Sequence, residues 1–198
     1  MNQVNILRAF DLALSTIGLT ILLPLMLILA LACKIDVGFS LFKQQRVGRN
    51  KKPFTIYKFP TMKVGTPSVA THLVASGSMT SFGRLIRYTK LDELPQLWNV
   101  IKGEMSLVGP RPCLLNQIDL IRAREEHAVF NVGPGITGIA QLRGIDMSSP
   151  GILAVVDKEM ISQMSLKLYL RCIIMTLLGK GKGDRIRTQK SEYIHAVE

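Results

Sequence analysis

The sequence has few of the residues that build metal clusters or disulfide frameworks. Among its 198 residues are only three cysteines, Cys33, Cys113 and Cys172, and three scattered histidines. The cysteines are odd in number and far apart in the chain, so we expect neither a disulfide scaffold nor a zinc site. A reducing compartment is therefore expected, and any metal chemistry would depend on oxygen ligands.

Acidic residues are also scarce, with 14 Asp and Glu against 25 Lys and Arg, which gives a formal net charge of +11. Such a charge predicts an anionic partner, which is nucleic acid, an anionic membrane surface or a phosphorylated substrate. However, 47% of the residues are hydrophobic, which is too apolar for a typical nucleic-acid-binding module. The composition therefore argues against nucleic acid and indicates a membrane, and the length suits one compact domain.

A long apolar segment lies near the N-terminus, where residues 12–33 carry no charge. As a helix these residues would reach about 33 Å, enough to cross the hydrocarbon core. Three interpretations compete: a spanning helix, a cleaved signal peptide with an A-x-A-like site at residues 30–32, or an embedded helix broken at Pro24. The segment is too long for a signal peptide, and physical reasoning alone slightly favours the spanning helix. In both remaining cases the basic residues that follow place the domain in the cytoplasm.

The remainder of the chain predicts short elements joined by loops. In the first half we expect a β-hairpin over residues 39–63 that turns at Gly48, and then a loop over 64–81. A short helix ending at Gly103 should follow, with Leu94, Leu97, Trp98 and Ile101 on one face. After it we expect a helix over 114–130, a loop over 133–138, an interfacial amphipathic helix over 159–178 and a loose basic tail. The hairpin cations Arg46, Arg49 and Lys58 either face anionic headgroups or contact a substrate phosphate.

The pair Asp92–Glu93 is isolated in a strongly basic region. These are the only acids between residues 37 and 103, a range that contains eleven Lys and Arg. If Asp92 is the N-cap of the short helix, Pro95 falls in the first turn, where proline is tolerated. Capping alone can account for one acid at this position, so a purely structural role is the simplest interpretation.

The basic setting also permits a catalytic interpretation. A helix N-terminus together with Arg84, Arg87, Lys90 and Arg111 would lower the pKa of Asp92 and keep this carboxylate ionised. An ionised carboxylate among phosphate-binding groups is a suitable nucleophile toward phosphorus. Its neighbour Glu93 could hold a divalent metal or transfer protons, and Mg²⁺ is the expected ion. This interpretation predicts phosphoryl transfer from a nucleotide diphosphate at a membrane surface.

Three sequence blocks carry a resemblance to one known family. They are "TKLDELPQLWNVIKGEMSLVGPRP" (residues 89–112), "RVGRNKKPFTIYKFPTM" (46–62) and "PGITGIAQLRG" (134–144). On these residues the chain resembles the bacterial sugar transferases, and in particular the small, monotopic polyprenyl-phosphate phosphoglycosyl transferases. The resemblance covers nearly the whole chain, and the apolar anchor precedes the motifs in the right order.

The resemblance implies a fold and a location. It implies an α+β, mainly α, protein in which residues 1–36 form a re-entrant membrane helix broken at Pro24. Residues 37–198 would form a compact cytoplasmic domain with a small β-hairpin and surface amphipathic helices. The protein would lie in the bacterial inner membrane with its catalytic domain on the cytoplasmic face, and the re-entrant anchor replaces the spanning helix as our prediction.

The resemblance also implies a reaction. A sugar-1-phosphate would pass from a UDP-sugar to polyprenyl (undecaprenyl) phosphate, with release of UMP, as the first step of membrane glycan assembly. Asp92 would attack the sugar-bearing phosphate and form a covalent aspartyl-phosphosugar intermediate, and Glu93 would assist with a metal or a proton. Both acids would hold the Mg²⁺ that this family requires. The positions that match the family's substrate-binding and phosphate-binding motifs are Lys58, Arg87, Pro110 and Arg111.

Three positions depart from the family pattern. Pro60 replaces a basic residue, Leu23 stands where some members have serine, and Tyr169 replaces an acid. Two alternatives from other classes stay open on the residues alone. One is a non-catalytic basic protein of the membrane surface, and the other is a phosphatase or phosphodiesterase that uses the same acid pair.

Overall fold

The computed structural model describes residues 3–66 and 76–181. The helices are α1 (Gln3–Val37), α2 (Ser81–Tyr88), α3 (Gln96–Lys102), α4 (Ile118–Glu126), α5 (Ile139–Leu142), α6 (Pro150–Ser162) and α7 (Leu166–Leu177). The strands are β1 (Phe42–Val47), β2 (Pro53–Lys58), β3 (Ser106–Val108) and β4 (Gly135–Thr137), and the short 3₁₀ turns are η1 (Arg49–Lys51), η3 (Ser76–Ser78), η4 (Leu91–Glu93) and η5 (Val129–Asn131). The predicted tail from residue 182 onward, and residues 67–75 of the predicted loop, lie outside the described residues.

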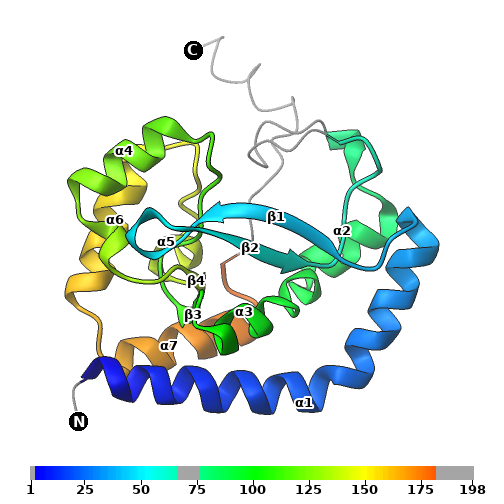
Figure 1. Ribbon diagram of the computed structural model, residues 1–198, viewed down its shortest axis with the longest axis horizontal. Coiled ribbons are helices and arrows are strands. Elements are labelled where there is room, and N and C mark those ends of the chain that lie inside the picture. Colours follow the sequence, from blue (N-terminus) through cyan, green and yellow to red (C-terminus); the bar gives the residue numbers. More distant parts are fainter. Residues whose placement is uncertain (1–2, 67–75, 182–198) are drawn as a thin grey trace, which may run out of the picture.

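The strands form two small sheets inside a mainly helical fold (Figure 1). β1 and β2 pair antiparallel, from Phe42 opposite Lys58 to Val47 opposite Pro53, which confirms the predicted hairpin. The prediction that residues 133–138 form only a loop is wrong, because β4 pairs in parallel with β3. The partner strand lies almost 30 residues earlier in the chain, so the local sequence carries no signal for this pairing.

Helix α1 is the longest element and contains Pro24 in its interior. It passes along one side of the molecule beside α7 and α3, then bends and continues beside α2 (Figure 1). An interior proline removes a backbone hydrogen bond and kinks a helix, which accounts for a bend in an otherwise continuous element. By length and composition α1 could cross a membrane, and its outward side carries large exposed apolar residues, among them Ile17, Ile21 and Ile28.

The N-terminal half of α1 is attached to the domain by polar contacts. Arg8 donates to the carbonyl oxygens of Val100 (2.7 Å) and Ile101 (3.1 Å) in the last turn of α3. The buried carboxylate of Asp11 accepts from the Leu107 N–H at 2.8 Å and from the Tyr169 hydroxyl at 2.6 Å. The hydroxyl of Tyr169 therefore joins α7 to α1.

The C-terminal half of α1 is attached by apolar packing instead. Leu29 and Cys33 are buried in one cluster with Phe59, which follows β2, and Ile86 of α2. Both halves of the helix therefore contact the same domain, on either side of the bend.

Several predicted boundaries differ from the structure. Helix α3 begins at Gln96 with Pro95 as its N-cap, so the prediction that Asp92 caps this helix is wrong. The buried positions of α3 are Gln96, Asn99 and Val100, whereas Trp98 of the predicted apolar face is half exposed. The predicted helix over 114–130 is reduced to α4 and η5. The predicted helix over 159–178 is two helices, α6 and α7, because the hydroxyl of Ser165 caps a new start by accepting from the Leu168 N–H.

Candidate active site

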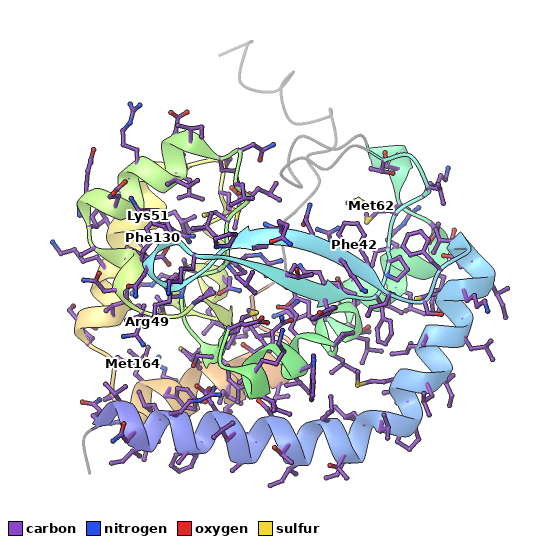
Figure 2. The ribbon with its side chains drawn as sticks, in the orientation of Figure 1. Phe42, Arg49, Lys51, Met62, Phe130 and Met164 are labelled. Atoms are coloured by element: carbon purple, nitrogen blue, oxygen red, sulfur yellow. The ribbon has the colours of Figure 1, made fainter. Side chains whose placement is uncertain are left out.

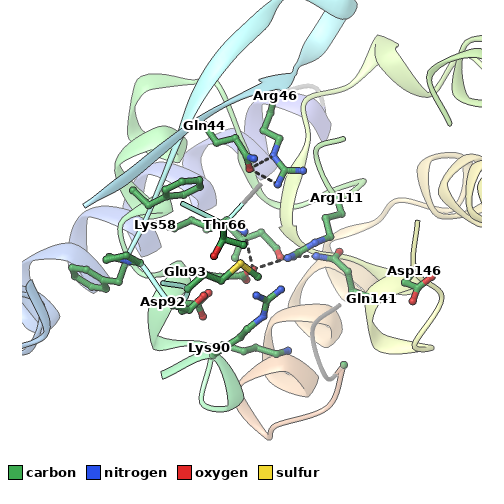
Figure 3. Close-up of a pocket in the computed structure, with 18 of the residues that line it drawn as sticks. Gln44, Arg46, Lys58, Thr66, Lys90, Asp92, Glu93, Arg111, Gln141 and Asp146 are labelled. Carbon is green, nitrogen blue, oxygen red and sulfur yellow. Dashed lines mark hydrogen bonds and ion pairs between the residues drawn. The ribbon is translucent and has the colours of Figure 1, made fainter. Parts of the chain in front are cut away.

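A cavity of about 490 Å³ opens between the hairpin, η4 and the loop that follows β3 (Figure 3). Its charged lining is strongly basic, with seven basic side chains against three acidic ones. The charged lining residues are Arg46, Lys58, Lys63, Arg87, Lys90, Arg111 and Arg143, with Asp92, Glu93 and Asp146. Such a cavity favours a polyanionic ligand such as a diphosphate.

Asp92 and Glu93 enter this cavity from η4, a 3₁₀ turn rather than a helix N-terminus. Lys90 opens the turn in the left-handed conformation, with φ of 59°, and the backbone oxygen of Asp92 accepts from the N–H of Phe59 after β2. These two features bend the chain sharply and hold the acid pair against the end of the hairpin. The sharp turn places both adjacent carboxylates at the cavity.

Asp92 is only 6% exposed, and this burial decides its protonation. Burial, together with the neighbouring charge of Glu93, raises the pKa of Asp92 to about 6, although Lys58, Arg87 and Arg111 act in the opposite direction. The prediction that its surroundings lower this pKa is therefore wrong, since desolvation outweighs the cations. The carboxylate still ionises near neutral pH, and burial leaves it less solvated than an exposed carboxylate.

Glu93 is held between two cations from different elements. Its Oε1 lies 3.0 Å from Nη2 of Arg111 and 3.6 Å from Nζ of Lys58, and the side chains of all three residues are largely buried. Burial, and then the charge of Arg111, lower the pKa of Lys58 to about 8, and Glu93 partly offsets this effect. Lys58 therefore stays mostly protonated near neutral pH, and the three groups form one charged cluster beside Asp92.

The structure brings together five of the six predicted site residues. Lys58, Arg87, Asp92, Glu93 and Arg111 all line the cavity. Pro110 is buried behind it, where its carbonyl oxygen accepts from the Gly135 N–H at 2.8 Å. Pro110 thus supports the loop and does not itself face this cavity.

Two other predicted cations lie elsewhere, and two, Arg46 and Lys90, line the cavity. Arg84 is exposed on α2, and Arg49, like Lys51, lies at the end of the hairpin far from Phe42 (Figure 2). Arg46 does line the cavity, and its guanidinium donates to Oε1 of Gln44 at 2.6 Å. Of the hairpin cations considered from the sequence, Arg46 and Lys58 are therefore placed to contact a substrate.

The side of the cavity away from the hairpin contains residues that sequence reasoning missed. Gln141 donates to the Ile136 carbonyl oxygen at 2.8 Å, and the hydroxyl oxygens of Thr137 and Thr176 lie 2.6 Å apart. Asp146 lines the same region. Thr137 and Gln141 belong to the "PGITGIAQ" block, which could have identified them, whereas Thr176 and Asp146 lie in no recognised motif.

The donor set of this cavity suits a hard cation that keeps open positions. No group of three or more His, Cys, Asp and Glu occurs within residues 3–66 and 76–181 that could hold a metal by itself. Asp92 and Glu93 offer two adjacent carboxylates beside several cations that could contact substrate phosphates. Mg²⁺ typically binds in this way, through one or two carboxylates, water and substrate phosphates.

The comparisons with known proteins agree on one family. A family model described as "Bacterial sugar transferase" matches residues 2–181. The uncharacterized sugar transferase EpsL of Bacillus subtilis is 37% identical over 171 residues, which are 86% of this chain and 84% of EpsL. The exopolysaccharide production protein PSS of Rhizobium leguminosarum bv. phaseoli is 35% identical over 193 residues, or 89% of this chain and 96% of that protein.

A relative with a named reaction is longer than this chain. The UDP-glucose:undecaprenyl-phosphate glucose-1-phosphate transferase of Caulobacter vibrioides is 41% identical over 143 residues. The match covers 70% of this chain but only 54% of that protein. The chain therefore spans most of the length of the two shorter relatives and about half of the longer one.

Proposed function

The chain belongs to the bacterial sugar transferase family, and from this premise we propose that it transfers a sugar-1-phosphate from a UDP-sugar to polyprenyl phosphate with release of UMP. The observation that carries the proposal is a buried aspartate, Asp92, in a cavity whose other charges are mostly basic. A relative whose name states this donor, acceptor and transferred group supports the substrate classes.

The first step would use Asp92 as the nucleophile. An Asp92 carboxylate oxygen attacks the phosphorus that carries the sugar, the bond from this phosphorus to the UMP oxygen breaks, and a phosphosugar is left on Asp92. Arg111 and Lys58 lie beside the acid pair, where they would stabilise the negative charge of the diphosphate and of departing UMP. The partial burial of the site would keep water from hydrolysing the intermediate.

The second step would return Asp92 to its carboxylate form. An oxygen of polyprenyl phosphate attacks the same phosphorus, the bond to Asp92 breaks, and a polyprenyl-diphosphate-linked sugar results. Asp92 and Glu93 are the residues that would hold Mg²⁺, which would supply positive charge at the phosphate oxygens. Glu93 would also keep Arg111 and Lys58 directed at the reacting phosphate.

Release of UMP from a UDP-sugar tests the proposed function directly. The purified chain, with MgCl₂ and undecaprenyl phosphate in detergent, is expected to release UMP from at least one member of a panel of UDP-sugars. Excess EDTA should abolish the release, because the acid pair would then have no cation to share with the diphosphate. Release of free sugar phosphate without any need for the lipid would instead indicate a phosphodiesterase, and inactivity on the whole panel would indicate a non-catalytic membrane protein.

We further propose that α1 is re-entrant and that both of its ends lie on the cytoplasmic face of the inner membrane. A straight helix of this length would extend about 50 Å, so its ends could not both meet one domain on the same side of a bilayer. In this fold Arg8 contacts α3 and Leu29 packs near α2, on either side of the bend. These attachments support an anchor that dips into one leaflet and returns.

Cysteine labelling from one side of the membrane tests this topology. Single cysteines at Val4 and Ile35, which are 73% and 80% exposed, should both react with an impermeant maleimide added to inside-out vesicles. Both should stay unlabelled when the reagent is added to intact spheroplasts. The three native cysteines are buried and provide a low background. Labelling of the two positions from opposite sides would contradict the re-entrant anchor.

A further inference from the structure

The backbone of the loop that carries Arg111 is fixed at four successive carbonyl oxygens. We call residues 109–113 the arginine loop. The oxygens of Pro110 and Cys113 accept from the backbone N–H groups of Gly135 (2.8 Å) and Val47 (3.0 Å), in β4 and β1. The oxygen of Pro112 accepts from Nη1 of Arg46 at 3.0 Å.

The fourth carbonyl, that of Arg111 itself, is held by a residue outside the cavity. Nη1 of Arg124, in α4, donates to the Arg111 oxygen at 2.7 Å. The remaining donors of the same guanidinium bind Asp157 of α6. Nε and Nη2 of Arg124 donate to Oδ2 of Asp157 at 3.0 and 2.7 Å. Arg124 therefore connects α6, through α4, to the backbone of the arginine loop.

Burying the Arg124–Asp157 ion pair costs free energy, so stabilisation of the fold alone is a poor explanation for its presence. Arg124 and Asp157 are each 1% exposed. Removing two charges from water costs several kcal/mol per ion, and apolar pairs of similar volume are often as stable or more stable. A buried arginine that also holds a particular carbonyl oxygen is better explained by what that carbonyl positions.

The residue that it positions lies at the centre of the proposed chemistry. Pro110 and Pro112 flank Arg111 and restrict the backbone on both sides. The Arg111 side chain then reaches Glu93 at 3.0 Å, with Lys58 at 3.6 Å from the same carboxylate oxygen. A shift of the Arg111 backbone would therefore displace the guanidinium from the acid pair and from any diphosphate bound there.

We propose that Arg124, braced by Asp157, is a positioning residue that fixes Arg111 for binding the diphosphate of the donor. This inference rests on the proposed function for its effect on turnover. Its effect on anion binding is independent of turnover and needs only that Arg111 contact the ligand. Arg124 does not line the cavity that contains Asp92, and it would act on the site through the Arg111 carbonyl.

The test replaces the charged pair by an apolar one. The double substitution Arg124→Met with Asp157→Leu should preserve the fold, with a Tm within a few degrees of wild type, because no buried charge is left unpaired. The affinity for UDP, measured by calorimetry, is expected to fall about 10-fold. The value of kcat/KM for UMP release is expected to fall about 10- to 100-fold, since a misplacement of about 1 Å can cost that much.

A second variant and a control accompany the swap. Arg124→Lys keeps the ion pair with Asp157 but loses the planar fork of donors, and it should show the same direction of change. The Arg124→Lys variant tests the inference even if the double variant with the apolar pair does not fold. Arg122→Met removes an exposed arginine from the same helix and should leave UDP affinity and turnover within about twofold of wild type.

A thermodynamic cycle with Arg111 separates positioning from general stability. If Arg124 acts through Arg111, the apolar swap made in an Arg111→Met background should reduce UDP affinity less than about twofold further. Fully additive losses, or an apolar swap with wild-type UDP affinity and turnover, would overturn the inference. Wild-type protein that binds UDP but releases no UMP would refute the proposed function and leave this cycle measurable.

Discussion

Asp92→Asn is expected to lower UMP release by about 10⁴-fold or more, which is the order seen when a covalent nucleophile is removed. The neutral amide has nearly the same size as the carboxylate, so the buried site should keep its shape. It cannot donate an electron pair to phosphorus as a carboxylate does, and the first step would stop. The measurement is UMP release from the preferred UDP-sugar under Mg²⁺ and lipid acceptor.

Intact-mass spectrometry gives this prediction a second, independent result. Wild-type protein incubated with the UDP-sugar and no acceptor should gain the mass of one phosphosugar, and Asp92→Asn should gain none. Asp119→Asn, which changes an exposed aspartate on α4, is the matched control and should retain both turnover and the adduct. Persistence of the adduct on the Asp92→Asn protein would show that another residue is the nucleophile.

The outcome at Asp92 shows where sequence reasoning reached its limit. Isolation of Asp92 and Glu93 in a basic region drew attention to the pair, and the structure places both in the basic cavity. The expected direction of the Asp92 pKa shift was wrong, because a charge count contains the cations but not the desolvation. Burial depends on Phe59 and the hairpin closing over η4, which involves chain segments about 30 residues apart.

The fold was predicted where the pattern is local. The hairpin follows from alternating residues around a turn, and the end of α3 follows from Gly103, which adopts φ of 82°. The start of α3 was misplaced because Lys90, a lysine in the left-handed conformation, replaces a helix cap by a 3₁₀ turn. Lysine carries no sequence signal for that conformation, whereas glycine or asparagine would.

The contacts made by residues outside the recognised motifs could not be predicted from the sequence either. Nothing in the sequence singles out Arg124 within the predicted helix over 114–130, and its burial becomes evident only when Asp157 is brought against it. Tyr169 was interpreted from the sequence as the replacement of an acid, whereas in the structure its hydroxyl binds the carboxylate of Asp11 in α1. In both cases the partner lies more than 30 residues away, so no local pattern could have indicated it.

Glu93→Gln is expected to separate turnover from anion binding. The substitution removes the negative charge that Arg111 and Lys58 share, so the cavity becomes more positive. UDP affinity measured in EDTA should therefore be unchanged or stronger. By contrast, kcat for UMP release should fall about 10²- to 10³-fold, because the two cations lose the group that directs them and a Mg²⁺ held by the pair would lose a ligand.

The dependence on Mg²⁺ distinguishes the two contributions of Glu93. If Glu93 is a ligand, the Mg²⁺ concentration that gives half-maximal activity should rise about 10-fold or more in Glu93→Gln, in line with the loss of a charged oxygen ligand. Glu125→Gln is the matched control, because Glu125 also pairs with a lysine, Lys51, but both side chains are about half exposed, away from the cavity. An unchanged kcat in Glu93→Gln would mean that Asp92 acts without its neighbour. A lower kcat with an unchanged Mg²⁺ requirement would mean that Glu93 only directs Arg111 and Lys58 and does not bind the metal. The two adjacent acids would then have different roles, with Asp92 as the nucleophile and Glu93 as the residue that orients the cations.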